Sequence, residues 1–387
     1  MIAPVYLDYN ATTPLLSEAL ESMLPYFQKH FGNPASPHLW GKEALDAVEK
    51  ARAQIASLFH TSPQEWIFTS GATEALNLAL QGLTQAYEGT GKNHLLIAAT
   101  EHKAVLDPAQ ALSKRGWIVE ILPVTASGII EPDTLRTALR PTTLLVAIML
   151  ANNETGVTQP IQELGALTRQ AGVFFLCDTT QAAGKLSFSL DELPVDLAVL
   201  SAHKFYGPKG VGALYMRRKQ PRVSLKPLLL GGGHEKGLRS GTLPVPLIVG
   251  MATALHRVYE KLSSFSSQMT YLKTKLWEGI QSLYPLARLN AKDAPCLPNT
   301  LSVTFPGLKA SDILARAPLL AAATGAACSS ARPEPSHVLL AMGLTPAEAQ
   351  ATLRFSLGLP TTETDIDNAL LHLSQAIQQL TPTLKAP

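Results

Sequence analysis

The stretch that decides the fold is 173–210, VFFLCDTTQAAGKLSFSLDELPVDLAVLSAHKFYGPKG. It contains two short apolar runs, 173–178 and 196–202, and each leads into a residue capable of chemistry. Asp178 ends the first run, and Lys204 follows the second. Runs that are apolar throughout are typical of strands buried on both faces of a sheet. Ligands of such sheets bind beyond the carboxyl ends of the strands, so we expect functional residues at these two positions.

The same pattern extends outward from about residue 64 to 216. Short β-rich runs alternate with amphipathic helical stretches, which predicts an α/β fold with a mostly parallel, helix-covered central sheet. The expected strands are 66–69, 94–99, 117–124, 143–150, 173–178, 196–202 and 211–216.

The pattern changes after the three glycines 231–233. We expect one long helical region over 247–283, a strand over 300–305, and helices near 345–355 and 364–380. This predicts a domain boundary near residue 250, with a large domain over 15–250 and a smaller α+β domain over 251–387.

Composition narrows the function classes. The 387 residues are 46% hydrophobic and 16% charged with a net charge of +2, which fits a globular enzyme and favours neither nucleic acid nor a membrane as partner. The N-terminus does not resemble a signal peptide. The three cysteines, Cys177, Cys296 and Cys328, show no paired metal spacing. We therefore expect a cytoplasmic protein with no metal site of its own and, if any cysteine is special, a reactive one.

Lys204 and Asp178 each have two interpretations. Lys204 is either a surface lysine in a turn or a Schiff-base lysine whose amine is made nucleophilic by its surroundings. Asp178 is either a helix N-cap or the carboxylate that keeps a pyridinium nitrogen protonated, so that a cofactor ring can accept electrons.

Two further strand ends carry candidate residues. In FTSGATEALNLAL, the backbone N–H groups of Gly71, Ala72 and Thr73 would cradle a phosphate at a helix N-terminus, or the segment is an ordinary capping box. His102, in ATEHKAV, is either structural or stacks on a cofactor ring and shuttles protons near neutral pH.

Polar segments later in the chain contain further residues that could bind a substrate or a phosphate, and a loop that carries a cysteine. Asn152 and Asn153, in NNETG, are turn formers or offer an amide to a ligand. Arg354, in TLRFSLG, forms a surface ion pair or binds a carboxylate through its two-pronged guanidinium. The glycine-rich loop GGGHEKGLRSGT ends at Thr242, which could reach a phosphate. Cys328 lies in TGAACSSARPEPSH, a loop of small residues and prolines that is unsuited to a core.

Taken together, these motifs resemble those of the cysteine desulfurases of the class V aminotransferase family, which are fold-type-I enzymes that use pyridoxal 5′-phosphate (PLP). The segments that carry the resemblance are YLDYNATTP, FGNPASPH, FTSGATEALNLA, EHKAV, NNETG, DTTQAAGK, SAHKFYGPKG, GGGHEKGLRSGT, GAACSSARPEPSHVL and RFSLG. They run nearly end to end and indicate the subgroup with a long cysteine loop. The resemblance implies a homodimer in which the N-terminal segment 1–14 joins the smaller domain.

The resemblance also implies a role for each candidate. Lys204 would carry PLP, Asp178 would meet the pyridine nitrogen, Gln181 the ring oxygen, and His102 would stack on the ring. The phosphate would be held by Ala72, Thr73, Ser201, His203 and, from the neighbouring subunit, Thr242. Asn153 and Arg354 would bind L-cysteine, with Asn153 also near the cofactor. Cys328 would take the sulfur as a persulfide and pass it to acceptor proteins, leaving L-alanine. In a complex, Cys328 could also ligate a cluster.

Three features depart from the pattern of the family. Cys177 replaces a histidine that commonly precedes the aspartate, and we interpret it as a small buried residue. The loop reads GAACSS where GSACTS is commoner. The sequence ends at Pro387, whereas longer relatives use a C-terminal extension to dock an iron–sulfur scaffold protein, so we expect weak binding of such a scaffold.

The alternatives are a selenocysteine lyase, which shares the fold and most motifs, an ordinary PLP aminotransferase, and a non-catalytic persulfide relay. A relay needs no electron sink, so the pairing of Lys204 with Asp178 argues against it. The sequence leaves open which pathway receives the sulfur: iron–sulfur assembly, tRNA thiolation, DNA sulfur modification or cofactor synthesis.

Overall fold

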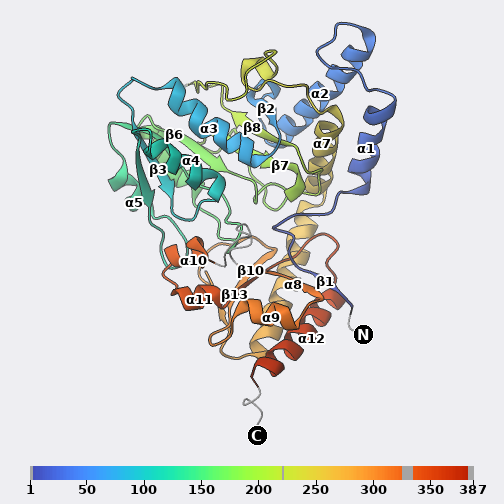
Figure 1. Ribbon diagram of the computed structural model, residues 1–387, viewed down its shortest axis with the longest axis vertical. Coiled ribbons are helices and arrows are strands. Elements are labelled where there is room, and N and C mark those ends of the chain that lie inside the picture. The colour runs from blue at the N-terminus through green and yellow to red at the C-terminus, as the bar shows by residue number, and fades with distance from the viewer. Residues whose placement is uncertain (1–2, 220–221, 325–333, 382–387) are drawn as a thin grey trace.

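A seven-stranded sheet forms the centre of the larger of two lobes in the computed structural model, which describes residues 3–219, 222–324 and 334–381 (Figure 1). Its strand order is β2-β8-β7-β6-β5-β3-β4, and neighbours are parallel except where β8 pairs antiparallel with β2 and β7. The strands are β2 Trp66–Thr69, β3 His94–Ala98, β4 Ile118–Leu122, β5 Thr143–Ala147, β6 Phe174–Asp178, β7 Leu197–Ser201 and β8 Gly212–Met216. The expected α/β class and the mostly parallel sheet are confirmed.

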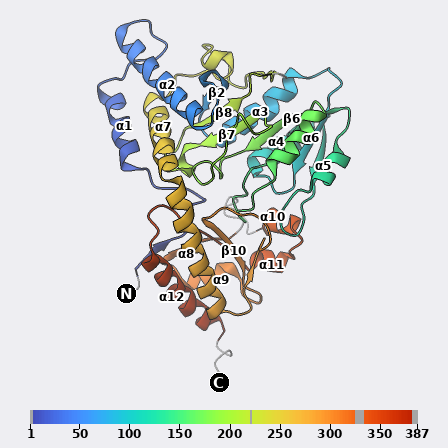
Figure 2. The same cartoon turned by 180° about the vertical axis from the view of Figure 1, so that it is seen from behind.

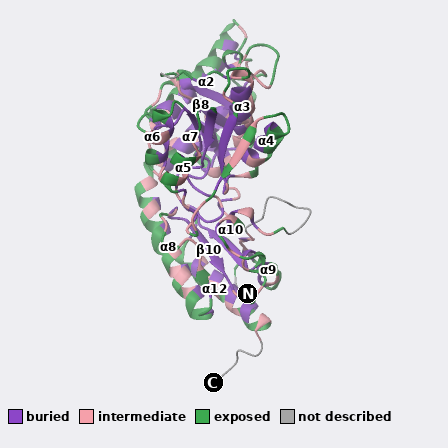
Figure 3. Cartoon of the chain, turned by 90° about the vertical axis from the view of Figure 1, so that its left-hand side faces the viewer, coloured by how far each residue is buried: buried purple, intermediate pink, exposed green. Residues whose placement is uncertain are grey.

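Helices cover both faces of this sheet because its strands present apolar side chains on both sides. Along β6, Phe175 and Cys177 join one core cluster while Phe174 and Leu176 join another, as the period of two along a strand requires. The first cluster lies under α2 (Leu39–Leu58), α6 (Ile161–Gln170) and α7 (Val245–Glu260), and the second lies under α3 (Ala72–Ala86) and α4 (Lys103–Ser113). Helix α1 (Ser17–Gln28) packs on α7, and α5 (Pro132–Ala138) packs on α6 and β4. The central strands are accordingly the most buried part of the lobe (Figure 3).

The smaller lobe has its own sheet and core. Strands β12 (Ala323–Thr324), β13 (Thr352–Ser356), β10 (Thr300–Thr304) and β9 (Arg288–Leu289) form an antiparallel sheet in that order. It packs with α8 (Leu262–Leu283), α9 (Ala310–Arg316) and α12 (Glu363–Leu380), while α10 (His337–Ala341) and α11 (Pro346–Gln350) face the larger lobe (Figures 1 and 2).

The N-terminal segment bridges the two lobes. Strand β1 (Val5–Tyr6) pairs with β11 (Leu320–Ala321), and Val5 and Leu7 belong to the core of the smaller lobe. A few residues later, Thr13 bonds to the backbone of His203 in the larger lobe. The segment therefore holds the lobes together where they meet.

The smaller lobe differs from the sequence-based expectation in two places. The expected helix near 345–355 is wrong beyond Gln350, because α11 ends there and Thr352–Ser356 forms strand β13. The single helical region over 247–283 is two helices that divide at Lys261. Helix α7 packs on the large-lobe core and α8 on the other core, so the packing changes at Lys261 and not at residue 250.

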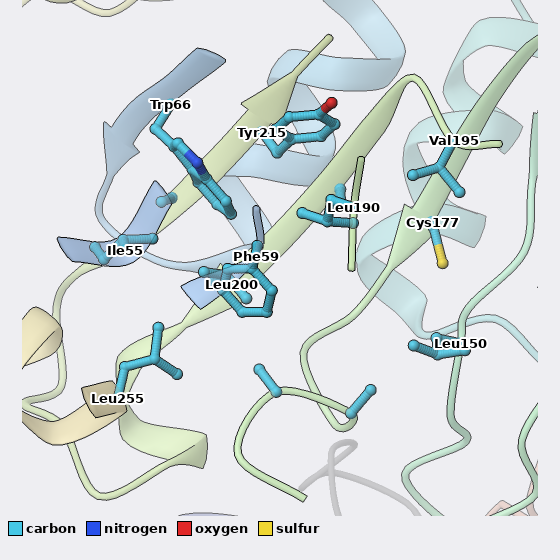
Figure 4. Packing of buried hydrophobic residues seen from close by; sticks show 14 of the residues in the cluster. Ile55, Phe59, Trp66, Leu150, Cys177, Leu190, Val195, Leu200, Tyr215 and Leu255 are labelled. Atoms are coloured by element: carbon cyan, nitrogen blue, oxygen red, sulfur yellow. The ribbon is translucent and has the colours of Figure 1, made fainter. Parts of the chain in front are cut away.

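Cys177 has no exposed surface and lies among hydrophobic side chains of the first cluster, which include Leu150 and Val195 (Figure 4). Burial raises the pKa of its thiol well above the usual value, and the nearby charge of Asp178 adds to this. A thiol that stays protonated is a poor nucleophile, so the structure confirms the interpretation of Cys177 as a buried residue. No helix among the described residues is long and apolar enough to cross a bilayer.

Candidate active site

A pocket of about 760 Å³ opens at the carboxyl edge of the central sheet, where the two lobes and the N-terminal segment meet. A volume of this size is usual for small-molecule and cofactor sites. Eleven of the residues singled out from the sequence line it: Gly71, Ala72, Thr73, His102, Asn153, Asp178, Gln181, Ser201, His203, Lys204 and Arg354. Those of the larger lobe come together because β2, β3, β5, β6 and β7 all end at this edge, and Arg354 reaches the pocket from strand β13 of the smaller lobe.

The N-terminus of α3 forms an anion cradle at one end of the pocket. Gly71 precedes the helix with φ 154°, and a side-chain carbon placed on it would lie 3.7 Å from Ser201 Oγ. The first backbone N–H groups of a helix have no intrahelical acceptor, so those of Ala72 and Thr73 are available to a ligand. His203 also lines the pocket, and its Nδ1 lies 3.2 Å from Thr12 Oγ1. Burial, with the charge of Lys204, lowers the pKa of His203 to about 4, so the imidazole is neutral at neutral pH.

Lys204 follows β7 and points at the N-terminal segment. Its Nζ donates to the carbonyl oxygens of Asn10 at 2.7 Å and Ala11 at 2.8 Å. The Asn10 carbonyl also accepts from Gln181 Nε2 at 3.0 Å, and the Asn10 side chain donates to Thr300 Oγ1 at 2.9 Å. Asn10 therefore fixes the position of the Lys204 side chain. From the sequence alone there was no reason to assign a role to Asn10, which lies in the segment YLDYNATTP.

Asp178 sits at the end of β6, and its Oδ1 accepts from the backbone N–H of Thr180 at 2.9 Å. A second carboxyl, Glu101, is 1% exposed and accepts from the backbone N–H of Met149 at 2.6 Å. Burial, with the negative charge of Asp178, raises the pKa of Glu101 well above its usual value. Glu101 therefore holds a proton more readily than an ordinary glutamate does.

His102 caps α4, and its Nδ1 accepts from the backbone N–H of Ala104 at 3.0 Å. Burial lowers the pKa of His102, with Lys204 adding to the effect and Asp178 opposing it. A neutral imidazole that accepts at Nδ1 carries its proton at Nε2. The same hydrogen bond makes His102 the N-cap of α4. The structural role of His102 therefore also fixes its tautomer.

The two asparagines of NNETG have different tasks. Asn152 forms the turn, since its Oδ1 accepts from the backbone N–H groups of Glu154 and Thr155, each at 2.9 Å. Asn153 lines the pocket, and its carbonyl accepts from Arg354 Nη1 at 2.9 Å.

Arg354 is 5% exposed on strand β13, so it is not a surface residue. Its Nη2 pairs with Asp8 Oδ1 at 2.6 Å, and its Nε is buried without a hydrogen-bond partner among the described residues. Contacts from the N-terminal segment and the NNETG turn thus fix a guanidinium that lines the pocket.

Glu154 also lines the pocket and is a functional candidate that the sequence reasoning missed. Its carboxylate accepts from the Ser336 hydroxyl, which caps α10. Burial raises the pKa of Glu154 to about 7, although Ser336, Arg354 and Lys103 act against this. The side chain therefore titrates near neutral pH within the site.

The glycine-rich loop is anchored by two ion pairs. Glu235 makes a buried bidentate pair with Arg52 of α2, at 2.7 and 2.8 Å, and accepts from the backbone N–H of Phe68 at 2.7 Å. Arg239 pairs with Glu74, in the first turn of α3, at 2.8 Å. Thr242 is exposed and does not line the pocket of its own chain. The two ion pairs tie the loop to α2 and α3 and leave Thr242 exposed.

Cys328 lies outside the described residues. The described chain resumes beside the pocket, where 334–337 contribute to its lining. His337 Nε2 bonds to the carbonyl of Glu101 at 2.9 Å, next to His102. The described ranges contain no cluster of three or more His, Cys, Asp or Glu side chains that could hold a metal ion.

The donor set fits a phosphorylated aromatic aldehyde such as PLP. A helix N-terminus suits its phosphate, Lys204 can bond covalently to its aldehyde carbon, and the carboxyl group of Asp178 suits a protonated ring nitrogen. Thr180 Oγ1, which lines the same pocket, is buried without a hydrogen-bond partner in the described structure, as expected of a hydroxyl that awaits a ligand.

Comparisons with known proteins agree with this geometry. Residues 5–369 match the family described as Aminotransferase class-V. Among curated relatives, "Cysteine desulfurase IscS" of Anaeromyxobacter sp. (strain Fw109-5) is 46% identical over 381 residues, covering 98% of this chain and 94% of that protein. "Cysteine desulfurase IscS" of Rickettsia bellii is 44% identical and covers 98% of this chain and 92% of that protein.

Solved structures give the same result. A "NIFS-LIKE PROTEIN" superimposes with a TM-score of 0.90 at 37% identity, covering 97% of this chain and 100% of that chain. "SspA in complex with cysteine" superimposes with a TM-score of 0.81 at 37% identity, covering 91% and 98% of the two chains.

Proposed function

This chain belongs to the aminotransferase class-V family and is a cysteine desulfurase, and from that premise we propose how its residues carry out the reaction. L-Cysteine and the thiol of Cys328 give L-alanine and a persulfide on Cys328. The Cβ–S bond of the substrate breaks and an S–S bond forms, so that the sulfur atom leaves the substrate without any external oxidant. The persulfide then passes its outer sulfur to an acceptor protein.

The observation that carries the proposal is the convergence of Lys204, Asp178 and Arg354 on one pocket. PLP, when bound, acidifies the Cα–H bond of an amino acid by drawing electrons into its ring. Lys204 would hold the cofactor covalently, and Asp178 would keep its ring nitrogen protonated. Ala72, Thr73, Ser201 and His203 would hold its phosphate.

Arg354 would bind the substrate carboxylate. Its guanidinium is already oriented by Asp8 and the Asn153 carbonyl, so little conformational freedom is lost on binding. Asn153 would contact the amino acid on the same side of the pocket. His102, which is neutral with its proton at Nε2, would stack on the ring and exchange protons at that atom.

Three further parts of the proposal concern the second subunit, the sulfur acceptor and the cellular compartment. We place Thr242 in the phosphate site of a second copy of the chain, because it is exposed on an anchored loop and does not line its own pocket. We place the acceptor among proteins with a reactive thiol, since a persulfide transfers by attack of a thiolate. A thiol that must stay reduced suits a reducing compartment such as the cytoplasm.

The test is turnover of L-cysteine by the purified protein, with alanine and sulfide measured together. Wild-type protein should release alanine, and Cys328→Ser should bind PLP equally but form alanine far more slowly. If wild-type protein with PLP bound formed no alanine from L-cysteine, the proposed reaction would be refuted. Turnover of L-selenocysteine that is unaffected by Cys328→Ser, with poor turnover of L-cysteine, would instead identify a selenocysteine lyase.

A further inference from the structure

Lys185 is a buried lysine that the reaction described above does not use. It lies four residues after Gln181 and is 5% exposed. Its Nζ donates to Gln181 Oε1 at 2.8 Å and to the Gln181 carbonyl at 3.2 Å. No carboxylate within the described ranges forms an ion pair with it. An ammonium group without an anionic partner is costly to bury, so its position calls for an explanation.

The contact determines which way the Gln181 amide faces. Oε1 accepts from Lys185, while Nε2 donates to the Asn10 carbonyl at 3.0 Å. If the two ends of the amide exchanged places, its NH2 group would face the amine of Lys185 and its oxygen would face the Asn10 oxygen. The bond to the Asn10 carbonyl would be lost, and so would the bond to a protonated Lys185, so the two partners together select a single orientation.

The selected orientation matters because Gln181 lines the pocket while Lys185 stands behind it. An amide NH2 group has two N–H donors, and Asn10 takes one of them. We propose that Lys185 is a positioning residue, which orients the Gln181 amide so that its second N–H donates to the phenolic oxygen of the cofactor. This inference rests on the proposed function, because it presupposes PLP in the pocket.

The electrostatic surroundings of Lys185 are compatible with this task over a wide pH range. Burial lowers its pKa to about 7, and the charges of Lys204 and Arg354 contribute in the same direction. Both the neutral amine and the ammonium ion can donate to Gln181 Oε1. The Asn10 carbonyl accepts only from Nε2 in either case, so the orientation of the amide is maintained on both sides of neutrality.

The experiment is a pH titration of the visible absorbance of the holoprotein, which reports the pKa of the nitrogen that links Lys204 to the cofactor. A donor to the phenolic oxygen withdraws charge from it, so that it holds the neighbouring linkage proton less tightly. Lys185→Met should therefore raise this pKa by about 0.5 to 1 unit, the size of effect that one hydrogen bond supplies. Gln181→Ala should raise it by at least as much.

The double variant separates positioning from a simple field effect. If Lys185 acts through Gln181, Lys185→Met should add little in the Gln181→Ala background, because interacting residues give non-additive effects. Equal shifts in both backgrounds would mean that Lys185 acts through its charge alone, and would overturn the inference. No shift in either background would also overturn it.

Lys185→Gln provides the matched control, since it keeps an N–H donor and removes the charge. It should shift the linkage pKa less than Lys185→Met does, and an equal shift would contradict the assignment. The wild-type titration distinguishes failure of this inference from failure of the proposed function. Wild-type protein that binds no PLP through Lys204 would overturn both, whereas a normal wild-type band with additive variants would overturn the positioning role alone.

Discussion

Lys185→Met should change the pH dependence of folding stability in a predictable direction. Burial, together with the charges of Lys204 and Arg354, lowers the pKa of Lys185 from 10.5 in the unfolded chain to about 7 in the folded protein. Between these two values the unfolded chain binds more protons than the folded protein, so the free energy of unfolding rises with pH. Below about pH 7 both states are protonated, and the cost of burying the charge is present in full.

The magnitude follows from the size of the pKa difference. Each unit corresponds to 1.36 kcal/mol, so the full shift from 10.5 to about 7 corresponds to about 5 kcal/mol. Between about pH 6 and about pH 9, the folded protein releases a proton that the unfolded chain retains. Lys185 alone should therefore increase the free energy of unfolding by about 2.5 kcal/mol over this interval.

The assay is urea unfolding of PLP-free protein at about pH 6 and about pH 9, with wild type and variant in parallel. Other groups titrate in this interval, but they contribute to both proteins and largely cancel in the difference. Lys185→Met should be more stable than wild type at about pH 6, by several kcal/mol, and the advantage should shrink by about 2.5 kcal/mol at about pH 9. Lys292→Met removes an exposed lysine and should leave the pH dependence as in wild type. An identical pH dependence in wild type and Lys185→Met would refute the reasoning.

Four other outcomes are expected. Lys204→Ala should lose the visible absorbance of the linked cofactor, and a purified variant that keeps the wild-type band would contradict the assignment. Cys328→Ser should keep that band and its change on addition of L-cysteine, while amino-acid analysis detects little alanine; alanine at the wild-type rate would exclude Cys328 as the sulfur acceptor. Burial raises the pKa of Glu154 to about 7, so above that pH its negative charge near Arg354 should raise the KM for L-cysteine, and Glu154→Gln should give a KM that varies less with pH. Glu235→Ala leaves Arg52 buried without its bidentate partner and should lower the free energy of unfolding by about 3–5 kcal/mol in urea titrations, whereas Lys236→Ala, at an exposed neighbour, should change it little.

The larger lobe could be predicted from sequence because its signals are local. Apolar runs with turn residues after them mark each strand, and the residues that follow those runs meet at one edge by the geometry of parallel strands. This is why Asp178, Ser201 and Lys204 were found without a structure.

The smaller lobe and the supports of the site depend on contacts between distant segments. Strand β13 is short and directly follows α11. The local pattern of apolar residues therefore predicts a helix that continues past Gln350 and includes Arg354. Asn10 acts on Lys204, which is far away in the chain, through its backbone carbonyl, and a carbonyl carries no sequence signature. Lys185 looks like any charged residue after a turn until its burial is known.

The N-terminal segment makes completion of the pocket a late event in the synthesis of the chain. Asp8 lies 346 positions before its partner Arg354, so the two can pair only after the long intervening segment has been translated. Until then, Asn10 and its neighbours can contact Lys204 but cannot close the site from the other lobe. Pairings of such large sequence separation form slowly, and the first domain of a nascent chain generally folds before the last is made. Nascent chains that stop before Arg354 should therefore lack a finished amino-acid site, so that sulfur chemistry begins only after strand β13 has been made.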